Sequence, residues 1–236
     1  MWSGPRNLST ALMYAFAARG DCAVWDEPFY ACYLRATQLA HPMAAEIMAA
    51  DRRGPAEIAS ALGAAPPDDK ALFYQKHMCQ HMIEGMPRDW IGDVVNVFLI
   101  RHPDRVLASF GAKYGDITLD DIGFVQQAAL FDEVAQRTGS TPLVVDSADI
   151  RANPRAMLTQ LCRALGIAFP DNMLQWQAGP RPYDGVWAPV WYRAVHRSTG
   201  FAGVEGPLPE LPASLRAISD AALPHYDRLA RYKLAP

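Results

Sequence analysis

The hydrophobic pattern along the chain predicts short strands that alternate with helices. Residues 71–76 and 94–100 are rich in β-branched and aromatic side chains, which is typical of buried parallel strands. Residues 142–146 have the same character. The first two segments lead into basic residues, Lys76 and Arg101. We therefore expect both cations at the carboxyl ends of the strands, where α/β sheets bind ligands.

Helical periodicity and helix-boundary residues occupy the segments between these strands. Residues 30–63 are expected to contain two or three helices, broken near Pro42 and Pro55. Asn153 and Pro154 have the chemistry of a helix start. Further helices are predicted at residues 11–17, 103–112, 119–137, 154–165 and 211–232, the last with an interruption near Pro224.

Together these elements predict an α/β fold: a three-layer sandwich with a central parallel sheet flanked by helices. The length of 236 residues favours a single domain over residues 1–236, because one hydrophobic core can still serve a chain of this size. Residues 179–212 are rich in Pro, Gly and Trp and show neither the helical nor the strand periodicity of hydrophobic residues. We expect them to form an ordered loop, acting as a lid or substrate loop.

Composition excludes several classes of protein. Half of the residues are hydrophobic and a fifth are charged, which rules out intrinsic disorder, and no apolar run is long enough to span a membrane. The net charge of −3 predicts neither a nucleic acid nor a membrane as partner. The cysteines and histidines show no metal-ligand spacing, so we predict no metal site. The absence of a secretory signal points to the reducing cytoplasm.

The first candidate site is the loop at residues 3–10, S-G-P-R-N-L-S-T, which opens onto a helix. Backbone N–H groups at a helix start, the fork of Arg6 and two hydroxyls are the components of a phosphate cradle. The loop lacks the second Gly and the Lys of a Walker A motif. The alternative is an ordinary helix start in which Ser9 or Thr10 is the N-cap.

The second candidate is residues 98–109, in which a strand ends at Arg101 and Ser109 follows eight residues later on a helix. With the loop at residues 3–10, this combination resembles the sulfotransferases that use 3′-phosphoadenosine 5′-phosphosulfate (PAPS) on a P-loop-like α/β fold. The later segments V-V-D-S-A-D-I, N-P and L-C-R-A-L-G-I at residues 144–167 are similar to the same family. A bacterial branch with S-G-P-R-N-[LI]-S-T, D-E-P and S-T-G-F motifs is the most similar.

This resemblance implies a donor site in two parts. The loop residues would hold the 5′-phosphosulfate, with Arg6 also neutralising its bridging and 5′-phosphate oxygens, while Arg101 and Ser109 would hold the 3′-phosphate. A late basic loop would close over the 3′-phosphate, although a solvated loop with aromatic anchors explains that segment nearly as well. The predicted donor-binding residues are Gly4, Pro5, Arg6, Asn7, Leu8, Ser9, Thr10, Arg101, Ser109, Arg197, Ser198, Thr199 and Gly200.

Two residues are candidates for the catalytic base, and they resemble two branches of the family. Glu27, in W-D-E-P, lies where some bacterial and tyrosyl-protein sulfotransferases have a catalytic Glu. His77 follows Lys76 directly, whereas the cytosolic branch places one residue between its Lys and His. Lys76 would stabilise the leaving group or pair with an acidic neighbour. Each of these residues can also be explained by ordinary hydrogen bonds or ion pairs.

The sequence departs from the family in two places. Only Met1 and Trp2 precede the loop, where the family has a full central strand. Either the natural start lies upstream, or the strand is reduced to a stub. Leu8 stands where the commoner family loop has Gly, and its side chain would limit the approach of phosphate oxygens.

The sequence therefore predicts sulfuryl transfer from PAPS, as co-substrate, to a hydroxyl or amine of a small acceptor. The alternative is a P-loop-like protein, kinase-like or without catalysis, that binds a phosphorylated metabolite or nucleotide. Arg6 and Arg101 argue against a Walker-type kinase, which needs a loop Lys and a strand-end Asp for Mg²⁺.

Overall fold

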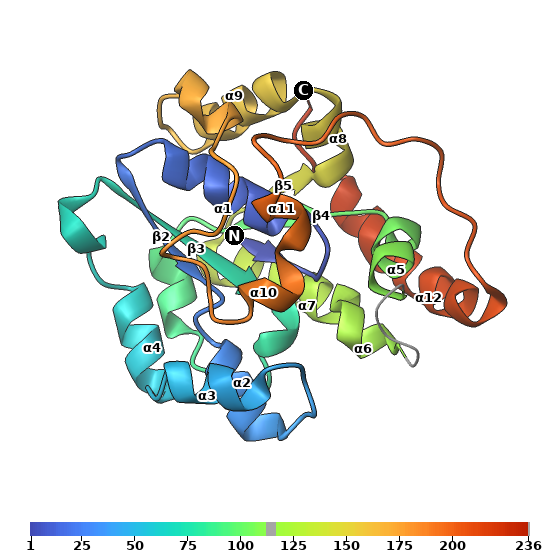
Figure 1. The fold of residues 1–236 in the computed structure, drawn as a ribbon, viewed down its shortest axis with the longest axis horizontal. Helices are drawn as coiled ribbons and strands as arrows, with labels where there is room; N and C mark the ends of the chain where they lie inside the picture. The colour runs from blue at the N-terminus through green and yellow to red at the C-terminus, as the bar shows by residue number, and fades with distance from the viewer. Residues whose placement is uncertain (112–116, 236) are drawn as a thin grey trace.

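The computed structural model describes residues 1–111 and 117–235. Its centre is a sheet of five parallel strands in the order β2-β3-β1-β4-β5 (Figure 1). The strands are β1 (Trp2–Ser3), β2 (Cys22–Asp26), β3 (Leu72–Met78), β4 (Val97–Ile100) and β5 (Leu143–Asp146). The predicted α/β sandwich is confirmed.

Helices precede or follow every strand, as the alternating pattern predicts. They are α1 (Ser9–Ala18), α2 (Tyr30–Thr37), α3 (Ala44–Ala50), α4 (Pro55–Leu62), α5 (Pro103–Gly111), α6 (Leu119–Ile122), α7 (Phe124–Thr138), α8 (Ser147–Ala152), α9 (Pro154–Ala164), α10 (Ala188–Trp191), α11 (Arg193–His196) and α12 (Ala213–Ala230). Within the described ranges, none of the helices has the length and apolar character that crossing a membrane requires.

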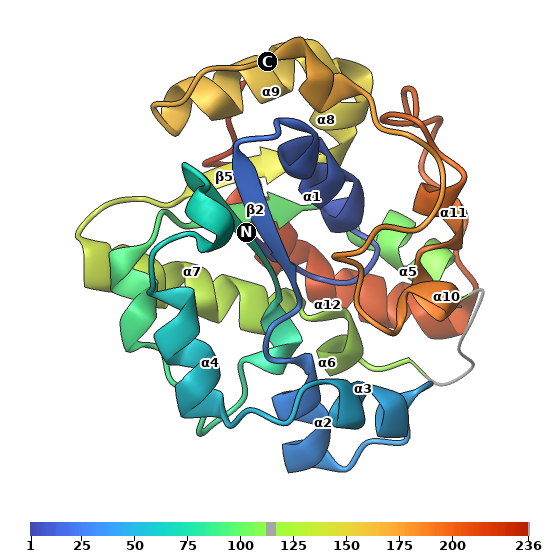
Figure 2. The same cartoon turned by 60° about the vertical axis from the view of Figure 1, so that its left-hand side comes forward.

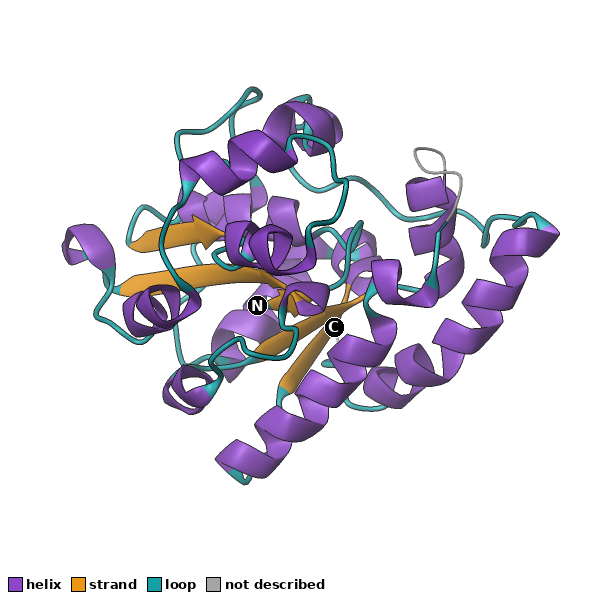
Figure 3. Ribbon diagram, turned by 90° about the horizontal axis from the view of Figure 1, so that it is seen from below, coloured by secondary structure: helices purple, strands orange, loops and turns teal. Residues whose placement is uncertain are grey.

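The sheet is covered on both faces (Figures 2 and 3). Strand β4 packs against helices on both of these faces, because successive side chains of a strand point to opposite sides of the sheet. Val97 and Leu99 pack in the core formed with α1 and α9, whereas Phe98 and Ile100 pack with α4 and α7. All four side chains are buried, so β4 has an apolar residue at every position, as expected of a central parallel strand.

Strand β1 is a stub of two residues at the centre of the sheet. Trp2 pairs with His77 of β3 on one side and Phe98 of β4 on the other. Its indole Nε1 donates to Asn96 Oδ1 at 2.8 Å, and the α-amino group of Met1 donates to the carbonyl of Gln75 at 2.8 Å. The buried indole and these bonds hold β1 between its neighbours, and the loop at residues 4–8 follows directly.

Five local predictions need correction, and the first is the loop expected at residues 179–212, which contains α10 and α11. Strand β2 and helix α8 were not expected from the pattern. The helix predicted at residues 119–137 is divided into α6 and α7 by Gly123, whose φ is 69°. Helix α12 continues through Pro224, because its packing against α5 and α7 offsets the loss of one backbone donor.

Candidate active site

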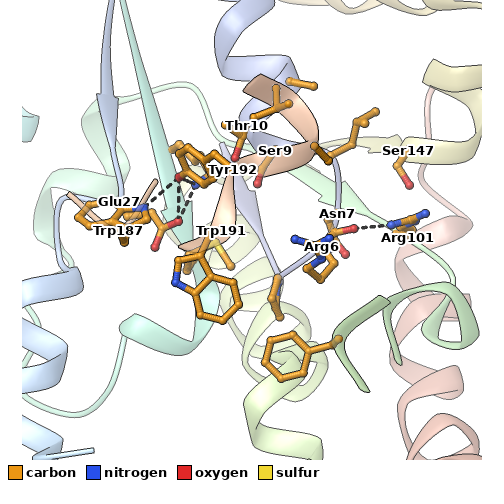
Figure 4. A pocket seen from close by; sticks show the side chains of 18 of the residues that line it. Arg6, Asn7, Ser9, Thr10, Glu27, Arg101, Ser147, Trp187, Trp191 and Tyr192 are labelled. Atoms are coloured by element: carbon orange, nitrogen blue, oxygen red, sulfur yellow. Dashed lines mark hydrogen bonds and ion pairs between the residues drawn. The ribbon is translucent and has the colours of Figure 1, made fainter. Parts of the chain in front are cut away.

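A cavity of about 340 Å³ opens at the carboxyl end of the sheet (Figure 4). Glu27, Met78, Arg101 and Ser147, which line it, lie at or just after the ends of β2, β3, β4 and β5. The lining also includes Pro5, Arg6, Asn7, Leu8, Ser9, Thr10, Ala11, Tyr30, Tyr33, Leu39, His41, Lys76, Gln80, His81, Phe110, Asp121, Arg151, Trp187, Trp191, Tyr192, Ala194, Val195, Ser198, Gly200 and Ala202.

One end of the cavity is formed by the loop that precedes α1. Leu8 is the N-cap, and no described side chain caps the helix. The first helical bond runs from Leu12 N to Leu8 O at 3.1 Å. The amides of Ser9, Thr10 and Ala11 are therefore the first-turn donors that a helix leaves without intrahelical acceptors. The alternative of a Ser9 or Thr10 cap is wrong, since both residues lie inside the helix.

The loop has an unusual backbone that turns it around the helix start. Arg6 and Leu8 have φ values of 62° and 74°, in the left-handed region that glycine adopts at least cost. Leu8 therefore occupies a conformation suited to the Gly of the commoner family loop. Asn7 anchors the loop by donating to Leu99 O at 3.3 Å, and its buried Oδ1 has no hydrogen-bond partner among the described residues.

Gly4 supports the loop from behind and does not line the cavity. A Cβ at this position would lie 2.7 Å from the carbonyl oxygen of Ile122, a separation that real Cβ atoms do not tolerate. The glycine thus permits close packing of the loop on α6.

Two arginines meet beside the loop, and Ser109 joins them. Arg101 donates to the carbonyl of Arg6 at 2.6 Å, and Arg6 Nε donates to Ser109 Oγ at 2.8 Å. Arg6 and Arg101 line the cavity, but Ser109 does not. Arg151 of α8 and the fully buried Ser147, which the sequence did not single out as site residues, also line this end.

At the opposite end, where Figure 4 shows Glu27 and Tyr192, Lys76 binds two adjacent carboxylates. Its Nζ donates to Asp26 Oδ1 at 2.8 Å, to Glu27 Oε1 at 2.6 Å and to the Tyr192 hydroxyl at 2.8 Å. Tyr192 in turn donates to Asp26 Oδ2 at 2.6 Å and accepts from Trp187 Nε1 at 3.0 Å. Strand register explains the pairing, because Asp26 and Lys76 are direct partners in β2 and β3.

These contacts keep the amino group of Lys76 protonated. Burial opposes its charge, but the carboxylates of Asp26 and Glu27 raise the pKa of Lys76 above its usual value. An ammonium has three N–H donors, and all three are used here. Of the two expectations for Lys76, the structure therefore shows the pairing with acidic neighbours.

A profile of the sulfotransferase domain family matches residues 1–232. The chain belongs to this family. Two curated proteins of Arabidopsis thaliana match 97% of this sulfotransferase-family chain: branched-chain-amino-acid aminotransferase-like protein 1 is 35% identical over 229 residues, and protein 2 is 33% identical over 228 residues. The chain spans 40% of the length of each.

Among solved structures, the sulfotransferase domain from the Synechococcus PCC 7002 olefin synthase aligns with this sulfotransferase-family chain. The TM-score is 0.46, the sequence identity is 15%, and the alignment covers 93% of this chain and 92% of that one.

His77, the second candidate base, lies on the other face of the sheet from Lys76. Successive side chains in a strand point to opposite faces, so His77 and Lys76 cannot share one site. The imidazole stacks on Trp2, with ring centroids 4.6 Å apart, and contacts Trp90 and Phe29. It does not line the cavity with Glu27, which corrects the expectation that either residue can serve as base in this sulfotransferase fold.

The late segment predicted to bind donor is only partly at the cavity. Ser198 and Gly200 line it, whereas Arg197 and Thr199 do not. Arg197 is exposed, and Ser198 Oγ donates to Val195 O at 2.7 Å while accepting from Trp176. The arginines that line this end of the cavity besides Arg6 are instead Arg101, which follows β4, and Arg151 of α8.

Aromatic side chains from α2 and from residues 187–192, in and around α10, form one wall of the cavity. The sequence indicated an apolar pocket from the Trp- and Tyr-rich residues 176–192, and Trp187 and Trp191 do line the cavity. His41 and His81 also line it, although no ligand spacing had marked them. Burial lowers the pKa of both histidines, so they are neutral groups in this wall.

Proposed function

We propose that the protein transfers a sulfuryl group from PAPS to a hydroxyl or amine of a small acceptor. One observation carries this proposal: the uncapped start of α1, the Arg6 side chain and the Glu27 carboxylate line a single cavity. Membership of the sulfotransferase domain family supports sulfotransferase chemistry at this site.

The residues present fit the donor at the loop end. First-turn amides at Ser9, Thr10 and Ala11, together with Arg6, suit the phosphosulfate oxygens. Arg101 suits the 3′-phosphate, because a guanidinium binds phosphate as a planar fork. Ser147 also lines this cavity, and its buried hydroxyl, which has no hydrogen-bond partner among the described residues, can donate to a phosphate oxygen.

Glu27 is the base in this proposal. It takes the proton of the acceptor hydroxyl or amine while the acceptor oxygen or nitrogen forms a bond to sulfur. The bond from sulfur to the bridging oxygen breaks, and 3′-phosphoadenosine 5′-phosphate (PAP) leaves with the electron pair. Lys76 and Tyr192 act as positioning residues, since they fix one oxygen of Glu27 and leave the other for the acceptor.

The aromatic wall fits a small acceptor with apolar surface, because such pockets combine apolar contact with a few polar groups. The four cysteines are free thiols, which fits a reducing compartment such as the cytoplasm.

Calorimetric binding of PAPS and PAP, with ATP as comparison, tests the donor. We expect selective binding of the 3′-phosphorylated nucleotides, weakened at least tenfold by Arg101→Ala. Arg52→Ala, which removes an exposed arginine, is the matched control and should bind as the wild type does. Equal binding of ATP and PAP would instead support the alternative of a protein that binds a phosphorylated metabolite without sulfuryl transfer.

A further inference from the structure

Three arginines converge on one carboxylate beside the cavity. Glu205 Oε1 forms ion pairs with Arg101 and, at 2.6 Å, with Arg151, and Glu205 Oε2 lies 3.0 Å from Arg105 Nε. The arginines belong to the β4 end, α5 and α8, whereas Glu205 belongs to the long connection between α11 and α12 (Figure 1). The Glu205 side chain is only 4% exposed, so it acts as an internal counter-ion.

The charges in this cluster do not balance. Burial opposes ionisation of Glu205, but the arginines around it hold the pKa of its carboxyl below the usual value. One negative charge therefore faces three positive ones. A phosphate monoester carries nearly two negative charges at neutral pH and three acceptor oxygens, so it would neutralise the arginines better than one carboxylate does.

Two of these three arginines also line the cavity. Arg101 and Arg151 line it together with Ser147, and Figure 4 shows Arg101 and Ser147 at one end. Within the described part of the chain, Arg101 Nε and Ser147 Oγ are buried without hydrogen-bond partners. Donors thus remain for a ligand at the point where Glu205 competes for the guanidinium groups.

The segment that carries Glu205 has few other attachments. Residues 201–212 contain no helix or strand. Arg151 Nε donates to Gly203 O at 2.9 Å, and Arg105 donates to Gly206 O at 2.5 Å. Among the described residues, every hydrogen bond of residues 203–206 comes from Arg101, Arg105 or Arg151. A ligand that recruits these arginines therefore releases the segment.

We propose that Glu205 is an internal competitor of the nucleotide: its carboxylate occupies the three-arginine cluster, and a phosphate monoester, the 3′-phosphate of the donor, displaces it. This inference rests on the proposed function, and it adds a carboxylate that weakens donor binding and couples it to movement of residues 203–206.

The substitution Glu205→Gln tests the competition, because it keeps the shape and removes the charge. Calorimetry should show that PAP binds about tenfold more tightly to Glu205→Gln than to the wild type. Adenosine 5′-monophosphate, which lacks the 3′-phosphate, should change less than twofold. Glu210→Gln removes an exposed carboxylate from the same segment and should leave both affinities unchanged.

The other outcomes separate the two proposals. If PAP binds Glu205→Gln equally or more weakly, Glu205 orients the arginines for the ligand, and the competition is refuted while the donor site stands. If PAP binds neither protein, the proposed function fails, and this inference fails with it.

A protease that cleaves after glutamate provides a second test on the wild-type protein. Addition of PAP should accelerate cleavage after Glu205, because the displaced carboxylate becomes accessible, and should leave cleavage after Glu210 unchanged. Slower cleavage after Glu205 in the presence of PAP would contradict displacement. Because this test uses the wild-type protein, it does not depend on the stability of Glu205→Gln.

Discussion

Glu27 leaves strand β2 in a left-handed conformation, with a φ of 44°. Its amide donates to Lys76 O at 2.9 Å, which ties the turn to the neighbouring strand. A non-glycine residue in this region costs roughly 1–2 kcal/mol. This strained conformation turns the proposed base from the end of the strand into the cavity. Strained backbone of this kind is common at functional sites.

Replacing Glu27 by Gln should lower turnover by about 10²–10⁴-fold, the usual effect of losing a general base. PAP affinity should stay within about twofold, since the loop and Arg101 are untouched. Turnover is measured with PAPS and an acceptor found by screening, and Glu46→Gln, at an exposed position of α3, is the control. Full activity in Glu27→Gln would remove this residue from the role of base.

Lys76→Met should destabilise the fold by about 3–5 kcal/mol, because removing one partner leaves buried charge without compensation. Denaturant unfolding measures the loss. Lys70→Met, which removes an exposed lysine bound only to Gly20 O among the described residues, should cost less than 1 kcal/mol.

The loss in Lys76→Met should depend on pH. Burial raises the pKa of Asp26 even beside Lys76, and without the ammonium it rises further. The folded variant then binds protons more readily than the unfolded chain, so its stability increases as pH falls. Unfolding at pH 8 and pH 5.5 should show a smaller deficit at the lower pH, and a constant deficit would contradict this account.

At the scale of elements, the loop and α6 pack without room for a side chain between them. Gly4→Ala should therefore push the Ile122 carbonyl and the loop apart. We expect a loss of roughly 1–3 kcal/mol, typical of overpacking, and weaker PAP binding. Gly92→Ala is the control, because a Cβ there meets nothing within 4 Å. Unchanged PAP affinity in Gly4→Ala would show that the loop adapts.

The elements with strong local signals were predictable from sequence. Strands β3, β4 and β5 have buried β-branched and aromatic residues, and α9 has both its Asn153 cap, which accepts from Ala156 N, and an apolar face. Strand β2 was missed because C-A-V-W-D is short and lacks a clear period. Helix α8 has only six residues, too few to show helical periodicity.

The part of the cavity lining at residues 5–10 was predictable, because the loop that forms it is contiguous in the sequence. Its partners were not. The Arg101–Glu205 pair joins residues 104 positions apart, and no local pattern encodes such a contact. The same holds for Tyr192, which reaches Lys76 across 116 positions. His77 is next to Lys76 in the sequence, but the alternation of side chains along β3 places it on the other face of the sheet.

At the scale of the whole molecule, buried histidines make stability sensitive to acid. Burial lowers the pKa of His77 and of His81 well below the usual value. Below pH 6.5 the unfolded chain binds protons that the folded chain does not, so stability falls as pH drops. Each such histidine contributes up to about 1.4 kcal/mol per pH unit.

In His77→Phe, the free energy of unfolding should change less with pH between pH 6.5 and 5, by the equivalent of about one proton fewer bound on unfolding. The reason is that Phe suits the aromatic surroundings and does not titrate. Urea unfolding at several pH values measures the slope. Turnover should stay near that of the wild type, since His77 lies outside the cavity. If His77→Phe is as stable as the wild type but shows no turnover, His77 would again be a candidate for the catalytic base.

The placement of β1 also has a consequence for biogenesis. Trp2 is bonded to Asn96 across 94 residues, and its strand is flanked by β3 and β4. The ribosome must therefore complete both flanking strands before the first one can enter the sheet. Until residues 97–100 have been made, the loop at residues 4–8 lacks the sheet that positions it, so the proposed donor site cannot form.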